Sequence, residues 1–364
     1  MWSYIYSSYT NSADPDSHAR SLGGWLIEGP TQTIQGLNVM REKSIPDAAD
    51  MTMRICARVL PYMLFTAMFG IWGASYFFTS IALRSFDPVS LPTLRMTIAA
   101  IALGGLVAVR RLPLPRDLRV WWHVAVLGAL NIAVPYILLT WAQEHVNSST
   151  ASVLSATTPL FVFLFSAFAT RAERFDAVRA TALVLAFAGV TLLNLTGSSG
   201  GASSGLWASM IVLSSMLFAA GNVYTRRFLH GIHPFVVALL QIGVGAFYLL
   251  VATAIRGNPH LVAPSVASTL ALLELGLAGS AVTYVLFFHF IQLWGSTATS
   301  INTYFQPFVG ISLGIYVLDE RIDARGWFAL SLVLVGIILF GIRAAWASSA
   351  AMNGSNPRIS GRSD

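Results

Sequence analysis

The heptapeptide RAERFDA (residues 171–177) is followed 147 positions later by LDERIDA (residues 318–324), and each lies between two long apolar runs. Both contain Glu-Arg, one apolar residue and Asp-Ala, so that Glu173 corresponds to Glu320 and Asp176 to Asp323. Only 10% of the residues are charged. A charged motif that occurs twice in the same apolar setting therefore indicates an internal duplication.

The duplication extends through most of the apolar region, because a shift of 148 positions aligns its two halves. The matched pairs are Met68 and Met216, Tyr76 and Tyr224, Gly128 and Gly276, Tyr136 and Tyr284, Ser148 and Ser296, Ser152 and Ser300, and Pro159 and Pro307. After one residue of slippage, Glu173 falls on Glu320 and Gly189 falls on Gly336.

The composition predicts a membrane protein. The chain has 364 residues, of which 55% are hydrophobic, and its mean hydropathy is +0.66. A soluble domain carries roughly 25% charged residues, more than twice the fraction found here. The net charge of +6 comes from short arginine clusters between apolar runs, without interleaved aromatic residues, so no nucleic-acid partner is expected. The single cysteine, Cys56, excludes an intrachain disulfide.

Ten apolar runs of roughly 20 residues predict ten transmembrane helices. They cover residues 59–83, 90–109, 120–141, 151–168, 177–195, 206–224, 234–255, 266–290, 299–317 and 327–342. Continuous runs of this length argue against the alternating pattern of a transmembrane barrel. The expected fold class is an all-α polytopic membrane protein.

The placement of arginines predicts the orientation of the chain. With the N-terminus in the cytoplasm, twelve arginines fall on the cytoplasmic side and four on the other side. We therefore expect a multi-pass protein of the inner (cytoplasmic) membrane with both termini in the cytoplasm. A unit of five helices enters the membrane from the opposite face when it is repeated, so the two repeats are inverted. Secondary transporters commonly have this architecture, with the substrate site between the repeats.

The expected domains follow from these runs. They are a polar, disordered N-terminal segment (1–58), a first five-helix repeat (59–195), a Gly/Ser linker (196–205), a second repeat (206–344) and a polar C-terminal tail (345–364). The linker matches G-x-S-x-G twice, but a nucleophile elbow needs a strand before it. Neither a P-loop nor an H-E-x-x-H motif occurs. We therefore expect no enzymatic activity, no cofactor and no metal site.

Three stretches resemble the EamA-type members of the drug/metabolite transporter superfamily. They are IWGASY (71–76), NSSTASVLSATTPLFVFLFSAFATRAERF (147–175) and STATSINTYFQPFVGISLGIYVLDERI (296–322). The resemblance covers residues 59–344 and implies ten helices, two five-helix repeats and a central cavity. It also implies export or import of amino acids, other metabolites or toxic compounds. Ala220 stands in the second copy where the first has Trp72, so the cavity is expected to be asymmetric.

Polar and aromatic side chains inside the apolar runs are candidates for the substrate path, because polar groups are costly in hydrocarbon. The candidates are Trp72, Tyr76, Asn131, Tyr136, Asn222, Tyr224, Tyr284, Thr299, Asn302, Thr303 and Gln306. In the fourth and ninth runs the polar residues recur at spacings of three and four, which places them on one helix face. Close packing by small residues is the alternative explanation for these stripes, and ordinary packing is the alternative for the aromatic residues.

Arg95 and Glu274 are the clearest charges within the apolar runs, and we expect them at similar depth because each lies about two turns from the same side. Two interpretations stay open. The two groups form a structural ion pair, or Glu274 takes up a proton during a transport cycle.

The duplicated charged motif is expected to be structural. Asp176 and Asp323 are placed to cap the helices that follow them, and Glu173 and Glu320 to put negative charge at the same helix ends. A gating or ion-coupling role is the alternative.

The predicted function is secondary active transport of a small metabolite, such as an amino acid, a related metabolite or a drug-like compound. We expect alternating access across the cytoplasmic membrane in the direction of export; proton coupling and a homodimer remain open. Gly310 and Gly314 predict a close helix crossing, within one subunit rather than between two. The alternatives are an intramembrane enzyme and a receptor or scaffold that transports nothing. An enzyme should show a nucleophile and a base that converge, and the sequence shows no such set. A scaffold would not need a duplicated inverted unit with polar stripes.

Overall fold

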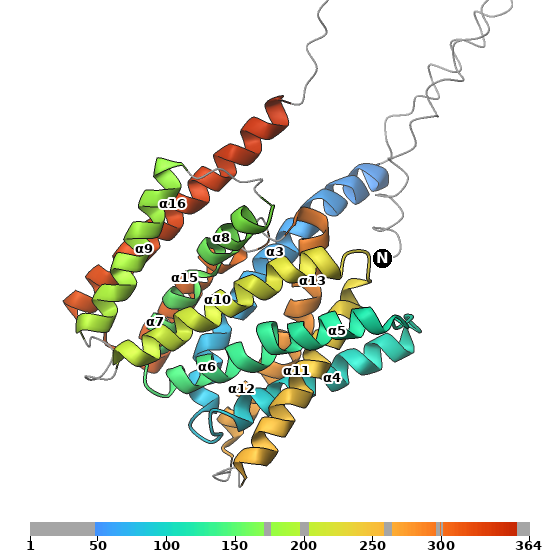
Figure 1. Cartoon of the computed structure of the whole chain (residues 1–364), viewed down its shortest axis with the longest axis horizontal. Coiled ribbons are helices and arrows are strands. Elements are labelled where there is room, and N and C mark those ends of the chain that lie inside the picture. Colours follow the sequence, from blue (N-terminus) through green and yellow to red (C-terminus); the bar gives the residue numbers. More distant parts are fainter. Residues whose placement is uncertain are drawn as a thin grey trace, which may run out of the picture. The chain divides into compact units, whose positions relative to one another are not determined.

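The computed structural model describes residues 48–170, 176–196, 204–257, 264–295, 299 and 301–354. Helices make up most of these residues, and no β-strand occurs in these ranges (Figure 1). The expectation of an all-α protein is therefore confirmed. The expected N-terminal segment up to residue 47 and most of the Gly/Ser linker lie outside the described residues.

The chain divides into two compact units, Met1–Leu64 and Phe65–Asp364. In the first unit the described residues form only the beginning of helix α3 (Ala48–Ala82), which continues into the second unit. The second unit contains the whole candidate site.

Each half of the apolar region forms a series of helices. The first half contains α3, α4 (Ser90–Val109), α5 (Leu118–Leu127), η2 (Gly128–Ala133), α6 (Val134–Gln143), α7 (Ser148–Ser155), α8 (Thr158–Thr170) and α9 (Ala177–Thr196). The second half contains α10 (Ser204–Phe228), α11 (Pro234–Arg256), α12 (Val266–Gly276), η3 (Leu277–Val282), α13 (Thr283–Trp294), η4 (Ile301–Tyr304), α15 (Gln306–Leu318) and α16 (Ala324–Gly354).

The two halves share their irregularities as well as their helices. A six-residue π-helical turn interrupts the third span at η2 and the eighth span at η3. The fourth span is broken between α7 and α8, and the ninth between η4 and α15. Pro159 and Pro307 are the second residues of the helices that follow these breaks. Proline has no N–H to donate, so it fits the first turn of a helix and not the interior.

Eight helical stretches of the described residues are long and apolar enough to cross a membrane, where the sequence predicted ten. They are Val59–Ala82, Ser90–Val109, Leu118–Gln143, Ser148–Ala167, Gly205–Phe228, Pro234–Arg256, Val266–Trp294 and Ala324–Arg343. The expected fifth span is present as α9, whose apolar stretch Ala177–Leu192 is shorter. The expected ninth span begins as a 3₁₀ turn and continues as α15, which has only 13 residues.

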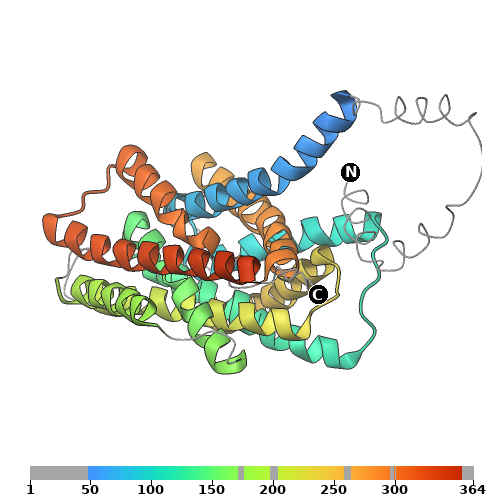
Figure 2. The same cartoon turned by 90° about the horizontal axis from the view of Figure 1, so that it is seen from above.

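Helices α9 and α16 pack side by side (Figures 1 and 2). Two glycines that the internal repeat aligned lie at their crossing. A Cβ on Gly189 would lie 2.6 Å from the Ala329 carbonyl oxygen, and a Cβ on Gly336 would lie 2.6 Å from the Ala182 carbonyl oxygen. The close approach of the two backbones therefore requires glycine at both positions.

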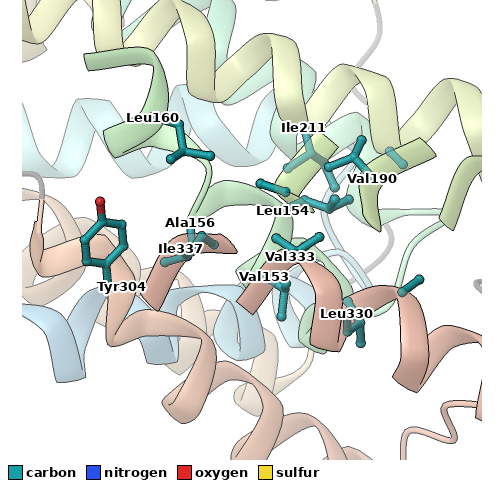
Figure 3. Close-up of a cluster of buried hydrophobic side chains, with 14 of the residues drawn as sticks. Val153, Leu154, Ala156, Leu160, Val190, Ile211, Tyr304, Leu330, Val333 and Ile337 are labelled. Carbon is teal, nitrogen blue, oxygen red and sulfur yellow. The ribbon is translucent and has the colours of Figure 1, made fainter. Parts of the chain in front are cut away.

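A buried apolar cluster joins helices of both halves (Figure 3). Leu154 from α7, Val190 from α9, Ile211 from α10 and Val333 from α16 meet in it, and each is less than one tenth exposed. The cluster borders the polar cavity, because Tyr76 belongs to the cluster and also lines the cavity.

Candidate functional site

A cavity lies among helices from both halves of the chain. Its lining residues are Trp72, Ser75, Tyr76, Thr79, Arg95, Pro135, Tyr136, Leu139, Gln143, Ser155, Thr158, Ser214, Ser215, Phe218, Thr303 and Gln306. They come from α3, α4, α6, α7, α8, α10, η4 and α15. The lining mixes aromatic and polar groups, as sites that hold small molecules do.

The broken helices supply polar groups to the cavity. At the break after α7, the hydroxyls of Thr157 and Thr158 donate to the carbonyl oxygens of Leu154 and Ser155, each at 2.7 Å. These hydroxyls bond to carbonyls at the interruption of the helix, where the Leu154 carbonyl also accepts the Thr157 N–H at 3.2 Å. The break thus brings Ser155 and Thr158 to the lining, as the break before α15 does for Thr303 and Gln306.

Hydrogen bonds across the two halves hold the wall of the cavity. The Tyr76 hydroxyl donates to Gln306 Oε1 at 3.2 Å, and Gln306 Nε2 donates to Asn302 Oδ1 at 3.1 Å. On the next face, Trp72 Nε1 donates to the Gly279 carbonyl oxygen at 3.0 Å. Side chains of the first span are therefore oriented by the eighth and ninth spans.

Arg95 is the one charged residue among the lining residues, and it is 3% exposed. Its Nε donates to Ser280 Oγ at 2.8 Å and its Nη2 to the Gly279 carbonyl oxygen at 3.0 Å. The guanidinium carbon lies 4.8 Å from the centre of the Tyr136 ring, a cation–π contact. These contacts fix the guanidinium at the wall of the cavity.

Glu274 and Arg95 do not lie within 4.0 Å of each other as an ion pair in the described residues. Among the described residues, the ion pairs within 4.0 Å are Arg256 with Asp87 and Arg343 with Asp176. The Glu274 carboxylate is half-buried on α12, and its Oε2 has no hydrogen-bond partner in the ranges described. The Arg95 charge still acts on the Glu274 carboxylate from a longer distance, and both interpretations of the pair stay predictions.

Six of the predicted path residues lie outside the lining. Asn131, on η2, donates to Gln241 Oε1 at 2.8 Å behind the cavity. Tyr284 is fully buried, and its hydroxyl contacts the Tyr136 hydroxyl at 3.2 Å. The Tyr224 hydroxyl hydrogen-bonds the His123 ring at 2.7 Å. The other three, all completely buried, are Asn222, Thr299 and Asn302.

Several lining residues were missed by the sequence analysis. Ser75 and Thr79 follow Trp72 by one and two helical turns, so the helical spacing that singles out Tyr76 would have included them. Gln143 closes the third span, and its side-chain oxygen and nitrogen have no hydrogen-bond partner within the described part of the chain. The lining also includes Ser214, Ser215 and Phe218, which the sequence analysis did not select.

The aspartates of the duplicated motif lie at the N-termini of the helices that follow. Asp176 Oδ1 accepts the backbone N–H of Arg179 at 2.9 Å, and Asp323 Oδ1 accepts that of Gly326 at 2.8 Å. The Arg179 N–H and the charge of Arg343 lower the pKa of Asp176, which lies outside the apolar spans. Both contacts have the geometry expected of an N-cap. Glu173 lies outside the described residues.

The sequence predicted that Glu320 places its negative charge at the N-terminus of the helix that follows. The structure places the carboxylate at a different helix, α7. Glu320 Oε1 accepts the N–H and the hydroxyl of Ser148, at 2.8 and 2.7 Å, and its Oε2 accepts those of Ser149, at 3.0 and 2.5 Å. Both serines are fully buried and begin α7 in the other half of the chain. The left-handed backbone of Asp319, with φ of 54°, turns the chain toward that helix. The carboxylate thus caps α7, whose first N–H groups carry partial positive charge.

The two glycines of α15 lie at its crossing with α7. A Cβ on Gly310 would overlap Ser152, and a Cβ on Gly314 would overlap Ser149 and the Glu320 carboxylate. The crossing is within one chain, and it joins the fourth span to the ninth.

Comparison with known proteins gives consistent matches. The model of the EamA-like transporter family matches residues 60–195 and 205–342. The "Uncharacterized inner membrane transporter YedA" of Escherichia coli (strain K12) is 29% identical over 282 residues, which are 76% of this chain and 90% of YedA. A "Probable terminal-alkyne amino-acid exporter" of Streptantibioticus cattleyicolor is 24% identical over 275 residues, 75% of this chain and 90% of that one.

One solved crystal structure has a similar fold. It is 19% identical and covers 79% of this chain and 98% of its own, with a TM-score of 0.58. At this identity the likeness concerns the fold alone.

Proposed function

Because this chain belongs to the EamA-like transporter family, we propose that it exports a small metabolite across the inner membrane by alternating access. The observation that carries the proposal is the polar and aromatic cavity, which is lined by helices of both halves. Its solute would be an amino acid, a related metabolite or a drug-like compound. The direction is proposed from the relative of Streptantibioticus cattleyicolor, whose name describes it as an exporter.

The proposed topology has ten crossings, with α9 and α15 as the fifth and ninth. Both termini then lie in the cytoplasm, and the two repeats (59–195 and 206–344) are inverted. Contacts between helix ends support this arrangement. Glu320 meets Ser148, and Arg256 meets Asp87, at ends assigned to the outer side, whereas Arg343 meets Asp176 at ends assigned to the cytoplasmic side.

Alternating access follows from the way the cavity is built. At the wall of the cavity, side-chain hydrogen bonds such as Tyr76 to Gln306 join the two halves, beside the apolar packing of the buried cluster. Polar contacts of this kind exchange for contacts with water or solute at little net cost. A rocking motion of one repeat against the other would then open the cavity to each side in turn.

Counterflow in proteoliposomes tests the proposal. Vesicles loaded with an unlabelled amino acid or metabolite should accumulate the same radiolabelled compound, whereas empty liposomes should not. Gln306→Leu removes a lining amide and should reduce counterflow at least tenfold. Ser312→Ala, on the exposed face of the same helix, is the matched control and should retain it. Absence of counterflow for every compound in a broad panel would refute transport.

A further inference from the structure

We propose that the cavity recognises a carboxylate and that Arg95 is its receptor, so that the solute is an amino acid or an organic acid and not a cationic amine. This inference rests on the proposed function only in taking the cavity as the solute site. It narrows a broad class of metabolites to those that carry a free carboxylate.

The first step of the argument is the fixed direction of the guanidinium. Arginine has five N–H donors, and two of them are bound, by Ser280 Oγ and by the Gly279 carbonyl oxygen. Ser280 is in turn held by its own bond to the Leu275 carbonyl oxygen, 2.9 Å away. Because both acceptors lie on the π-helical turn η3, the guanidinium is anchored along one edge. Its Nη1 has no hydrogen-bond partner among the described residues, and Arg95 lines the cavity.

The second step is the missing counter-charge. The lining contains no aspartate and no glutamate, and no carboxylate lies within 4.0 Å of Arg95 in the ranges described. The carboxylate of Glu274, on α12, acts on the Arg95 charge only from a longer distance and lies outside the lining. A buried cation without a paired anion is strongly unfavourable in a low-dielectric site. An anionic ligand would supply that charge and would bind as a two-point partner, since guanidinium and carboxylate form paired hydrogen bonds.

The third step concerns the rest of the ligand. Gln143 presents a buried amide with no described partner for either of its polar atoms, so it offers an acceptor and a donor to an ammonium or a hydroxyl. Trp72 and Phe218 contact each other edge-to-face, with ring centres 6.0 Å apart, and both line the cavity. They provide an apolar wall for a hydrocarbon or aromatic side chain. A cationic amine would meet the Arg95 charge with no carboxylate to balance it.

The test is a binding experiment with matched triplets of compounds. Each triplet contains an amino acid, the corresponding acid without the amino group and the corresponding amine without the carboxylate. Aromatic, branched and short linear triplets are titrated into the purified protein in nanodiscs. Binding is followed by quenching of tryptophan fluorescence and by the shift in Tm. The amino acid and the organic acid distinguish the two sources of the carboxylate.

Wild-type protein should bind the carboxylate members of at least one triplet and bind the matching amine at least tenfold more weakly. Arg95→Gln should weaken carboxylate binding about 10- to 100-fold, the range for loss of charged hydrogen bonds, and leave amine binding unchanged. Arg95→Lys should restore part of the affinity. Arg84→Gln, which changes an exposed arginine after α3, should behave as wild type.

Three results would overturn the inference: equal binding of acid and amine, unchanged carboxylate affinity in Arg95→Gln, or no binding of any carboxylate at millimolar concentration. The first and third use wild-type protein alone, so they hold even where a variant does not fold. Counterflow separates this inference from the proposed function. Transport of amines alone would refute carboxylate recognition and keep transport, whereas carboxylate binding without any counterflow would do the reverse.

Discussion

Glu320→Gln is the sharpest perturbation of the contact between the halves. The wild-type carboxylate accepts four hydrogen bonds from Ser148 and Ser149. A carboxamide has one oxygen, so it can accept only two of them, and its NH₂ group then faces two donors. Losing two hydrogen bonds to a charged group costs about 3–6 kcal/mol. Because Glu320 is only half-buried, solvent screening reduces this to about 2–3 kcal/mol.

A change of that size would shift the equilibrium between closed and open forms of this end by roughly 30- to 150-fold. The assay places a single cysteine at Leu139, which lines the cavity, in a Cys56→Ser background. A membrane-impermeant maleimide is added from the side on which Glu320 lies. We expect labelling to rise at least tenfold in Glu320→Gln, because the cap on α7 no longer holds the two halves together.

Asp319→Asn provides the matched control. Asp319 is the neighbouring residue, is exposed and has a left-handed backbone, a conformation that asparagine also adopts readily. This variant should label at the wild-type rate. Equal labelling of Glu320→Gln and wild type, or an equal rise in Asp319→Asn, would refute the idea that this carboxylate closes the cavity.

Three further predictions concern packing, coupling and pH. Gly189→Ala should lower the free energy of unfolding by about 1–3 kcal/mol through overpacking, seen as a lower Tm. Gly105→Ala, with open space around the added Cβ, should be neutral or stabilising. Equal effects of the two substitutions would contradict the tight crossing of α9 and α16. Glu274→Gln should abolish acidification of a trapped pH indicator while counterflow persists, and unchanged proton movement would exclude Glu274 as the proton carrier. The pKa of Asp176 lies below its usual 3.8, so its stabilising effect is complete above pH 3.8 and is lost as the pH falls through the folded-state pKa. Asp176→Asn should therefore lower Tm at pH 7 and reduce the fall of Tm at acid pH. An unchanged pH profile of Tm would contradict this.

The apolar runs and the internal repeat were readable from the sequence because each depends on local composition. Run length predicts helices in lipid, and a shift of 148 positions aligned Gly128 with Gly276, near the start of the two π-helical turns. The turns themselves were not predicted, since a π-helical turn has no simple residue signature. The ninth span was likewise expected to be one continuous helix, because its apolar run is not interrupted. Pro307 marks the place where the helix breaks.

Contacts between segments far apart in the chain could not be predicted from the sequence. Nothing in the sequence says that Glu320 lies against Ser148 rather than against its own helix, because the two are 172 positions apart. In the same way, Asn131 and Tyr284 were selected for their polarity within apolar runs, and both lie behind the cavity. Polarity in a membrane span predicts that a side chain has a partner, and only the tertiary structure decides whether that partner is a solute or another residue.

The carbonyl oxygen of Gly279 accepts hydrogen bonds from three donors. It receives Trp72 Nε1 at 3.0 Å, Arg95 Nη2 at 3.0 Å and the Thr283 hydroxyl at 2.8 Å, although a carbonyl oxygen has two lone pairs. The three donors therefore compete, and a group that draws the arginine away strengthens the hold on the other two. A solute that binds Arg95 would thus strengthen the hydrogen bond of Trp72 to Gly279, which connects α3 with η3. Solute binding would then make the packing of these two segments more rigid.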